Sequence, residues 1–119
     1  MLKLKKTNTV ARKVKVRLPT ENPNSFNEGE ILVRFKISTK DEIAERADRE
    51  LSDREYIGEI VDSVEGLGDE DGNPIAGDAA MHEVYAGVWS AYLQSAIFQE
   101  YHEQYGVARV KNSKTSRGR

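Results

Sequence analysis

The chain has 119 residues, of which 38% are hydrophobic and 32% charged, with a formal net charge of −2 and no cysteine. This length indicates one domain with a modest core. The lack of cysteine excludes disulfides, thiolate zinc sites and a cysteine nucleophile. No apolar run approaches 18 residues, and the basic start of the chain has no apolar signal segment, so we expect a cytoplasmic protein with no membrane partner.

The charges are segregated along the chain. Residues 1–20 contain seven Lys or Arg and no acid, and residues 104–119 contain five and no acid. The 83 residues between them contain all 20 acids and six Lys or Arg, a balance of −14 (six minus 20). The basic ends predict contacts with nucleic acid or an acidic partner, or with the acidic body of the protein itself.

The first half of the chain contains two strand patterns. Residues 9–19, "TVARKVKVRLP", alternate between apolar and basic side chains, and only Arg12 interrupts the apolar row. Residues 30–37, "EILVRFKI", place Ile31, Val33, Phe35 and Ile37 on one face and Glu30, Arg34 and Lys36 on the other. Both patterns have period two and predict strands with one buried face. We expect them to pair antiparallel through a long, mobile connection over residues 20–29, which are rich in Asn, Pro, Ser and Gly.

The pattern becomes helical at residues 38–51. Thr39 and Glu42 have the spacing of a capping box, which predicts the start of a helix. Its apolar stripe is thin and the remaining residues are mostly charged, so most of this helix is expected to face water. The stripe consists of Ile43, Ala47 and Leu51.

Residues 52–67 permit two interpretations. Ser52 and Glu55 have the spacing that caps a short helix, whereas "EIVDSVEGL" has the composition of a strand. We predict a short helical turn followed by a strand, which gives a three-stranded sheet.

Residues 66–75, "GLGDEDGNPI", combine acids with strong turn signals. If Gly72 takes the sixth position of a calcium loop, the first position falls on Leu67, which cannot bind the ion. Asp-Gly and Asn-Pro pairs are typical of turns. A structural turn is therefore favoured over a metal site. Its residues are Gly66, Asp69, Asp71, Gly72 and Pro74.

Residues 76–106 predict a long C-terminal helix. Asp78 is a suitable N-cap and Gly106 a suitable stop. Two neighbouring stripes form a wide apolar face. They consist of Val84, Val88, Ala91, Ser95 and Phe98, and of Tyr85, Trp89, Tyr92 and Ala96.

These elements together predict an α+β fold. We expect a small antiparallel sheet of two to three strands packed with two to three helices, the last of them long. Residues 1–106 form one domain in this prediction, and residues 107–119 form a flexible basic tail.

The aromatic residues of the long helix have two interpretations. At helical spacing aromatic side chains more often belong to a core, but six on one helix of a small domain exceed what a thin sheet can cover. The surplus predicts a protein-binding surface. The candidate binding residues are Tyr85, Trp89, Tyr92 and Phe98, with Arg109, Lys111 and Asn112 from the tail.

Residues with catalytic or ligand-binding potential are few. His82 and His102 are 20 residues apart, too far for a metal pair on one helix. The chain has no zinc-protease motif, nucleophile elbow, phosphate loop or dinucleotide fingerprint. We therefore expect no enzyme activity, no catalytic residue, no metal and no cofactor.

The segment "EIVDSVEGLGDEDGNPI", followed by a long helix and "RVKNS", resembles the tail assembly chaperones of long-tailed (siphovirus-type) bacteriophages and prophages. The resemblance extends over residues 58–113. Val64 stands where the family has a Trp. The matching residues are Gly66, Leu67, Asp69, Glu70, Gly72 and Pro74, with Lys111 and Asn112 near the end.

This resemblance implies a function. Such a chaperone binds the tape measure protein, keeps it soluble and helps to recruit tail tube subunits around it. It acts in the host bacterial cytoplasm and is absent from the mature virion. Opposite charges on the ends and the body also favour association between copies, which would form a homo-oligomer.

Two other classes remain open. One is another phage tail or head–tail joining structural protein, which would persist in the virion. The other is a small nucleic-acid-binding module that uses both basic ends, with an affinity that falls as salt rises. The tail has no interleaved aromatic residues, which makes nucleic acid the less favoured partner.

Overall fold

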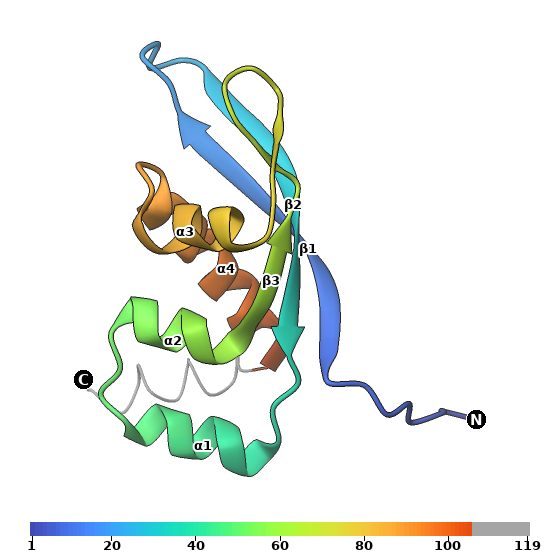
Figure 1. Cartoon of the computed structure of the whole chain (residues 1–119). Coiled ribbons are helices and arrows are strands. Elements are labelled where there is room, and N and C mark those ends of the chain that lie inside the picture. Colours follow the sequence, from blue (N-terminus) through green and yellow to red (C-terminus); the bar gives the residue numbers. More distant parts are fainter. Residues whose placement is uncertain (106–119) are drawn as a thin grey trace.

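The computed structural model describes residues 1–105, which form an α+β fold and confirm the predicted class. Figure 1 shows the elements in chain order. They are β1 (Thr9–Pro19), β2 (Phe26–Lys36), α1 (Lys40–Asp48), α2 (Asp53–Ile60), β3 (Val61–Glu65), β4 (Leu67–Gly68), β5 (Pro74–Ile75), α3 (Asp78–Ala86) and α4 (Ser90–Tyr105). The predicted helix stop at Gly106 and the predicted tail 107–119 lie outside the described residues.

Strands β1, β2 and β3 form an antiparallel sheet in that order, as predicted. The β1–β2 ladder runs from Thr9 opposite Lys36 to Pro19 opposite Phe26. Because β2 begins at Phe26 and not at residue 30, the predicted long connection over residues 20–29 is shorter than expected. The hydroxyl of Thr20 closes it by donating a hydrogen bond to the carbonyl of Ser25 at 2.9 Å.

The ladder between β2 and β3 contains a bulge. Arg34 lies opposite Ser63, but the next residue, Phe35, lies opposite Val61. Asp62 is therefore the extra residue on β3, and it is exposed to solvent. A bulge of this kind bends the strand and increases its twist.

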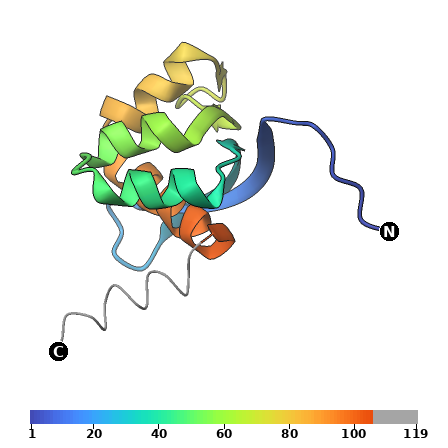
Figure 2. The same cartoon turned by 90° about the horizontal axis from the view of Figure 1, so that it is seen from below.

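One face of this sheet is covered by helices and the other faces solvent. Figures 1 and 2 show the helices gathered on the same side of the three strands. The alternating apolar residues of all three strands point toward this side, as the period-two pattern predicts. The buried hydrophobic residues are Val14, Val16, Ile31, Val33, Phe35, Ile57, Ile60, Val61, Val64, Ala80, Val84, Leu93, Ile97 and Tyr101.

Arg12 occupies the covered face of β1 without being buried. Its Nε donates to Oε2 of Glu100 on α4 at 2.7 Å, and its side chain is 44% exposed. This ion pair explains how a cation can interrupt the apolar row at the rim of the core.

The first two helices begin where the capping boxes predict. Thr39 accepts a hydrogen bond from the backbone of Glu42, and Ser52 does the same for Glu55. The predicted apolar stripe of α1 is only partly correct, however. Ile43 and Leu51 are half-buried, but Ala47 is exposed, and Arg46 is buried instead.

The predicted single long helix is also wrong, because it is broken at Gly87. Helix α3 ends at Ala86 and α4 begins at Ser90. A Cβ atom at residue 87 would lie 2.8 Å from the carbonyl oxygen of Glu83, closer than real contacts allow. The chain can therefore make this turn because residue 87 has no side chain.

The break changes which residues face the core. The buried residues are Ala80 and Val84 on α3 and Leu93, Ile97 and Tyr101 on α4. The predicted stripes include five positions that are exposed. These are Val88, Trp89, Ala91, Tyr92 and Ser95.

The start of α3 differs from the prediction as well. Gly77 is the N-cap, with a φ of 62°, and Asp78 is the first helical residue. A positive φ strongly favours glycine over aspartate at the cap. Asp78 still places a negative charge at the positive end of the helix dipole.

Candidate protein-interaction surface

Three exposed apolar side chains lie where α3 passes into α4. Val88 is 90% exposed, Trp89 40% and Tyr92 44%. The rings of Trp89 and Tyr92 have centroids 5.8 Å apart and are tilted by 58°. We call Val88, Trp89 and Tyr92 the junction patch. Exposed aromatic residues in contact with each other are typical of protein-binding surfaces.

The local sequence explains why this patch faces outward. The N–H of Gly87 donates to the carbonyl of Glu83, which ends α3, and the N–H of Leu93 donates to the carbonyl of Trp89, which begins α4. Leu93 is buried one turn after Trp89 and fixes the start of α4 to the core. The patch therefore lies on a short segment that is anchored on both sides.

A shallow groove connects Trp89 with the end of the β1–β2 hairpin. Its volume is about 460 Å³. Leu18 and Pro19 give it apolar walls, and Glu21 contributes the one acidic side chain of its lining. Thr20 and Asn27 complete the lining. The groove can accept an apolar side chain from a partner and places a carboxylate where a neighbouring cation can pair with it.

The structure divides the four aromatic residues predicted for binding into two exposed and two core-packed residues. Trp89 and Tyr92 are exposed, whereas Tyr85 and Phe98 pack against the core. Phe98 contacts Tyr56 edge-to-face at 5.6 Å, and the guanidinium of Arg54 lies 5.2 Å from the centroid of Tyr85. The tail residues predicted for binding lie outside the described residues. They are Arg109, Lys111 and Asn112.

The acidic segment after β3 forms a small hairpin. Gly68 lies opposite Pro74 in the β4–β5 ladder. The carboxylate of Asp69 accepts hydrogen bonds from the backbone N–H groups of Asp71 and Asn73, both at 2.9 Å. This side chain therefore organises the turn, as expected for an aspartate at the start of a tight loop.

Two glycines of this segment have conformations that other residues rarely adopt. Gly66 has a φ of 99°. A Cβ atom at this position would lie 3.3 Å from the carbonyl oxygen of Glu30 and 3.3 Å from the Cα of Ile31. Gly72 has a φ of 85° at the tip of the turn. Both positions are explained by the backbone geometry of the hairpin.

The two histidines occupy different environments. His82 on α3 is exposed, and the ring of His102 on α4 stacks on Phe98 with centroids 6.2 Å apart. Among residues 1–105, no three His, Asp or Glu side chains are grouped so that they could hold a metal ion. Within the same range no helix is both long and apolar enough to span a membrane.

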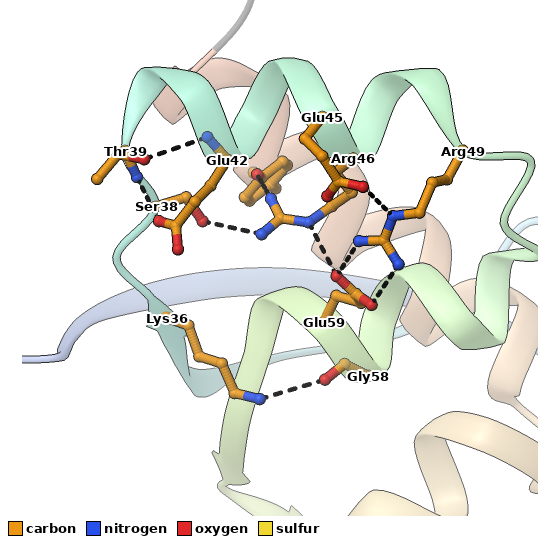
Figure 3. A network of polar contacts seen from close by, with 10 residues as sticks. Lys36, Ser38, Thr39, Glu42, Glu45, Arg46, Arg49, Gly58 and Glu59 are labelled. Carbon is orange, nitrogen blue, oxygen red and sulfur yellow. Dashed lines mark hydrogen bonds and ion pairs between the residues drawn. The ribbon is translucent and has the colours of Figure 1, made fainter.

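A partly buried polar cluster that the sequence pattern did not predict joins α1 to α2 and α4. Figure 3 shows Arg46 between Ser38 and Glu59, with Arg49 reaching the same carboxylate of Glu59. Arg46 Nη1 donates to the hydroxyl of Tyr101 at 2.9 Å, and Arg49 donates to both oxygens of Glu59 at 2.9 and 2.6 Å. These contacts position the first two helices.

The cluster also changes proton affinities. Hydrogen bonds from Arg49 hold the pKa of the Glu59 carboxyl below its usual value. Burial raises the pKa of the Tyr101 hydroxyl, so this group stays protonated and neutral at physiological pH. The cluster is therefore a compensated set of charges that supports the fold.

The solvent-facing side of the sheet carries charges of both signs. Arg17 pairs with Glu28 at 3.2 Å, Arg34 pairs with Glu65 at 2.5 Å, and Lys15 lies opposite Glu30. Opposite charges across a ladder stabilise strand pairing. Two of the three cations in the basic row of β1 thus lie opposite an acid on β2, whereas Lys13 lies opposite Leu32.

Comparison of the chain with protein-family models, with curated proteins and with solved structures finds no match.

Proposed function

We propose that this protein is a tail assembly chaperone of a siphovirus-type bacteriophage or prophage. It binds the tape measure protein, keeps it soluble and helps to recruit tail tube subunits. The observation that carries the proposal is the junction patch, an exposed aromatic surface held on a charged domain.

The physical demands on such a chaperone match this surface. A protein that keeps a long client soluble needs an apolar contact site and a charged exterior, and it needs no catalytic group. Trp and Tyr are the residue types most enriched where protein partners bind tightly. Here they are adjacent, 40% and 44% exposed, and flanked by the groove that contains Glu21.

The resemblance over residues 58–113 supports the same function. Gly66 and Gly72 are two of the matching positions, and both have positive φ angles. Asp69, another matching position, accepts two backbone hydrogen bonds within the turn. These matching residues therefore specify the hairpin that leads from β3 to α3 and to the junction patch.

The charge pattern of the sheet favours this proposal over a nucleic-acid-binding module. Phosphate binding through β1 needs a basic surface without neutralising partners. Arg17 and Lys15 instead face Glu28 and Glu30 across the ladder. Binding to DNA that is strong at low salt and falls steeply as salt rises would favour the nucleic-acid module.

Co-expression with the tape measure protein of the same genome tests the proposal. We expect this chain to keep the tape measure protein in the soluble fraction and to elute with it. A second expression of residues 1–106 shows whether residues 107–119 contribute to binding. If the tape measure protein precipitates in both cases while this chain elutes alone, the proposal is wrong.

Purified virions distinguish the chaperone from a structural tail or head–tail joining protein. A chaperone is absent from the finished particle, whereas a structural subunit is retained. The position of the gene provides an independent criterion, because a chaperone gene is expected between the tail tube gene and the tape measure gene.

A further inference from the structure

The first eight residues form an arm that leaves the body of the protein. Figures 1 and 2 both show it extending away from the sheet and helices. Every residue of this N-terminal arm (residues 1–8) is exposed, including Leu2 at 84% and Leu4 at 85%. Lys3 lies between the two leucines, and Lys5 and Lys6 follow Leu4. The arm thus presents apolar side chains with cations beside them.

A groove between α1 and the end of α4 has complementary properties. It has a volume of about 470 Å³ and is lined by Ser38, Lys40, Ile43, Ala44 and Tyr105. Three of these five residues are apolar or aromatic. We call it the α1 groove. Ile37, which precedes its first residue, is also 43% exposed.

The charges around the α1 groove also complement the arm. Helix α1 carries Asp41 and Asp48 at exposed positions, whereas Glu45 pairs with Arg49, and the one cation that lines the groove is Lys40. The arm carries three lysines and no acid within its eight residues. Lysines next to a docked leucine would therefore lie beside acidic side chains of α1. Such complementary charges speed the association of the arm with the groove and fix the position of the arm along it.

The arm and the groove lie at the same end of the molecule. The arm leaves the body at Asn8, whose carbonyl accepts a hydrogen bond from the N–H of Ile37 at 2.9 Å. Ile37 adjoins Ser38 at the edge of the groove. Seven extended residues reach about 23 Å, enough to cross to a neighbouring molecule. A twofold axis at this end would bring each arm to the groove of the other copy.

We propose that two copies of this chain exchange their N-terminal arms. Leu2 and Leu4 of one copy occupy the α1 groove of the second copy, and Lys3 and Lys5 lie beside the acids of its helix α1. The contact is reciprocal, so both grooves and both arms are used. This inference does not depend on the proposed function, because the α1 groove and the junction patch have no residue in common.

A spin-label experiment tests the contact directly. The chain has no cysteine, so Lys3→Cys gives a single labelling position. Chains at natural isotope abundance that carry a nitroxide at position 3 are mixed with ¹⁵N-labelled chains that carry no nitroxide. We expect line broadening at Ile43, Ala44 and Tyr105 of the ¹⁵N chains. No broadening, or broadening at the junction patch instead, would overturn the proposal.

A second sample distinguishes exchange from folding back. Chains that carry both the nitroxide and ¹⁵N are diluted into a large excess of unlabelled chains. Strong broadening of Ile43 in this sample, combined with none in the mixed sample, means that the arm occupies its own groove. That result would also overturn the proposal.

Sedimentation measures the consequence for assembly. We expect the wild-type chain to form dimers, and Leu2→Asp with Leu4→Asp, or Ile43→Glu alone, to weaken dimerisation at least tenfold. Val88→Asp is the matched control, since it changes an equally exposed apolar residue far from the groove, and it should leave the dimer intact. A wild-type chain that remains monomeric at all concentrations, or a dimer that is unaffected by the arm substitutions, would contradict arm exchange.

Discussion

The guanidinium of Arg46 donates a hydrogen bond to the hydroxyl of Tyr101 at 2.9 Å, although the two residues are 55 positions apart. Arg46 is 7% exposed and Tyr101 2%. The bond joins a short, highly charged helix near the middle of the chain to the C-terminal helix. Because Arg46 also donates to Ser38 and pairs with the partly exposed Glu59, its charge is compensated at the edge of the core.

Replacement of Arg46 should destabilise the fold. In Arg46→Met the apolar stem is retained, but the hydroxyls of Tyr101 and Ser38 lose their donor. We expect the free energy of unfolding to fall by about 1–3 kcal/mol, the cost of leaving buried hydroxyls without a partner, because Glu59 is partly exposed and keeps its pairing with Arg49. Urea unfolding followed by circular dichroism measures the change.

Arg17→Met is the matched control for that substitution. Arg17 and Glu28 are both more than 60% exposed, so their ion pair contributes little. We expect a change within about 0.5 kcal/mol. Equal losses in the two variants would contradict a buried structural role for Arg46.

Gly87→Ala tests the break between α3 and α4. The added Cβ would lie 2.8 Å from the carbonyl oxygen of Glu83 and would also contact its carboxylate. The backbone must therefore shift, at a cost of about 1–3 kcal/mol, as in other overpacked sites. Gly29→Ala provides the control, since a Cβ there meets nothing within 4 Å. A Gly87→Ala variant as stable as Gly29→Ala would show that the break does not require glycine.

The two capping boxes predict a loss of stability in acid. Hydrogen bonds from the backbone N–H of Thr39 and of Ser52 lower the pKa of Glu42 and Glu55, respectively. A carboxyl whose folded pKa is below its unfolded value, about 4.3, stabilises the fold above that pH. The contribution is lost as pH falls through the folded pKa.

The variant Glu42→Gln with Glu55→Gln isolates this effect. Glutamine can still complete a capping box but does not titrate in this range. We expect the wild type to be the more stable protein at pH 7 and the difference to shrink toward pH 2. Unfolding curves at several pH values test this, and a difference that stays constant with pH would argue against the assignment.

The junction patch should be separable from the stability of the fold. Trp89→Ser with Tyr92→Ser removes exposed rings and should change the free energy of unfolding by less than about 1 kcal/mol. Ile97→Ala, which truncates a fully buried side chain, should cost about 2–5 kcal/mol. If the patch variant is as unstable as Ile97→Ala, the two rings belong to the core.

The strands and helix starts of this fold were predictable because their signals are local. The alternation in residues 9–19 gives the bounds of β1, and Thr39 and Ser52 cap the helices that they precede. The first residues of β2 were missed because "FNEG" has little strand propensity. Pairing with β1 extends the ladder to Phe26 all the same.

The misses at α1 and at the α3–α4 junction arise from tertiary structure. A charged helix predicts exposure, and nothing in the sequence marks Arg46 for burial, because its partners Tyr101 and Glu59 are distant in the chain. The apolar spacing continues through Gly87, and an isolated glycine is tolerated inside a helix. The surplus of aromatic residues at helical spacing predicts Trp89 and Tyr92 as candidate binding residues, but only the break explains their exposure.

Co-expression of the tape measure protein with junction-patch variants tests the central claim most directly. The soluble fraction of the tape measure protein is compared for the wild-type chain, for Trp89→Ser with Tyr92→Ser, and for the exposed control Ile37→Ser, which lies just after the opposite end of β2 from the groove that Trp89 lines. We expect the patch variant to remain folded but to lose most of the solubilising effect, while the control retains it. A patch variant that keeps the tape measure protein as soluble as the wild type does would contradict the account.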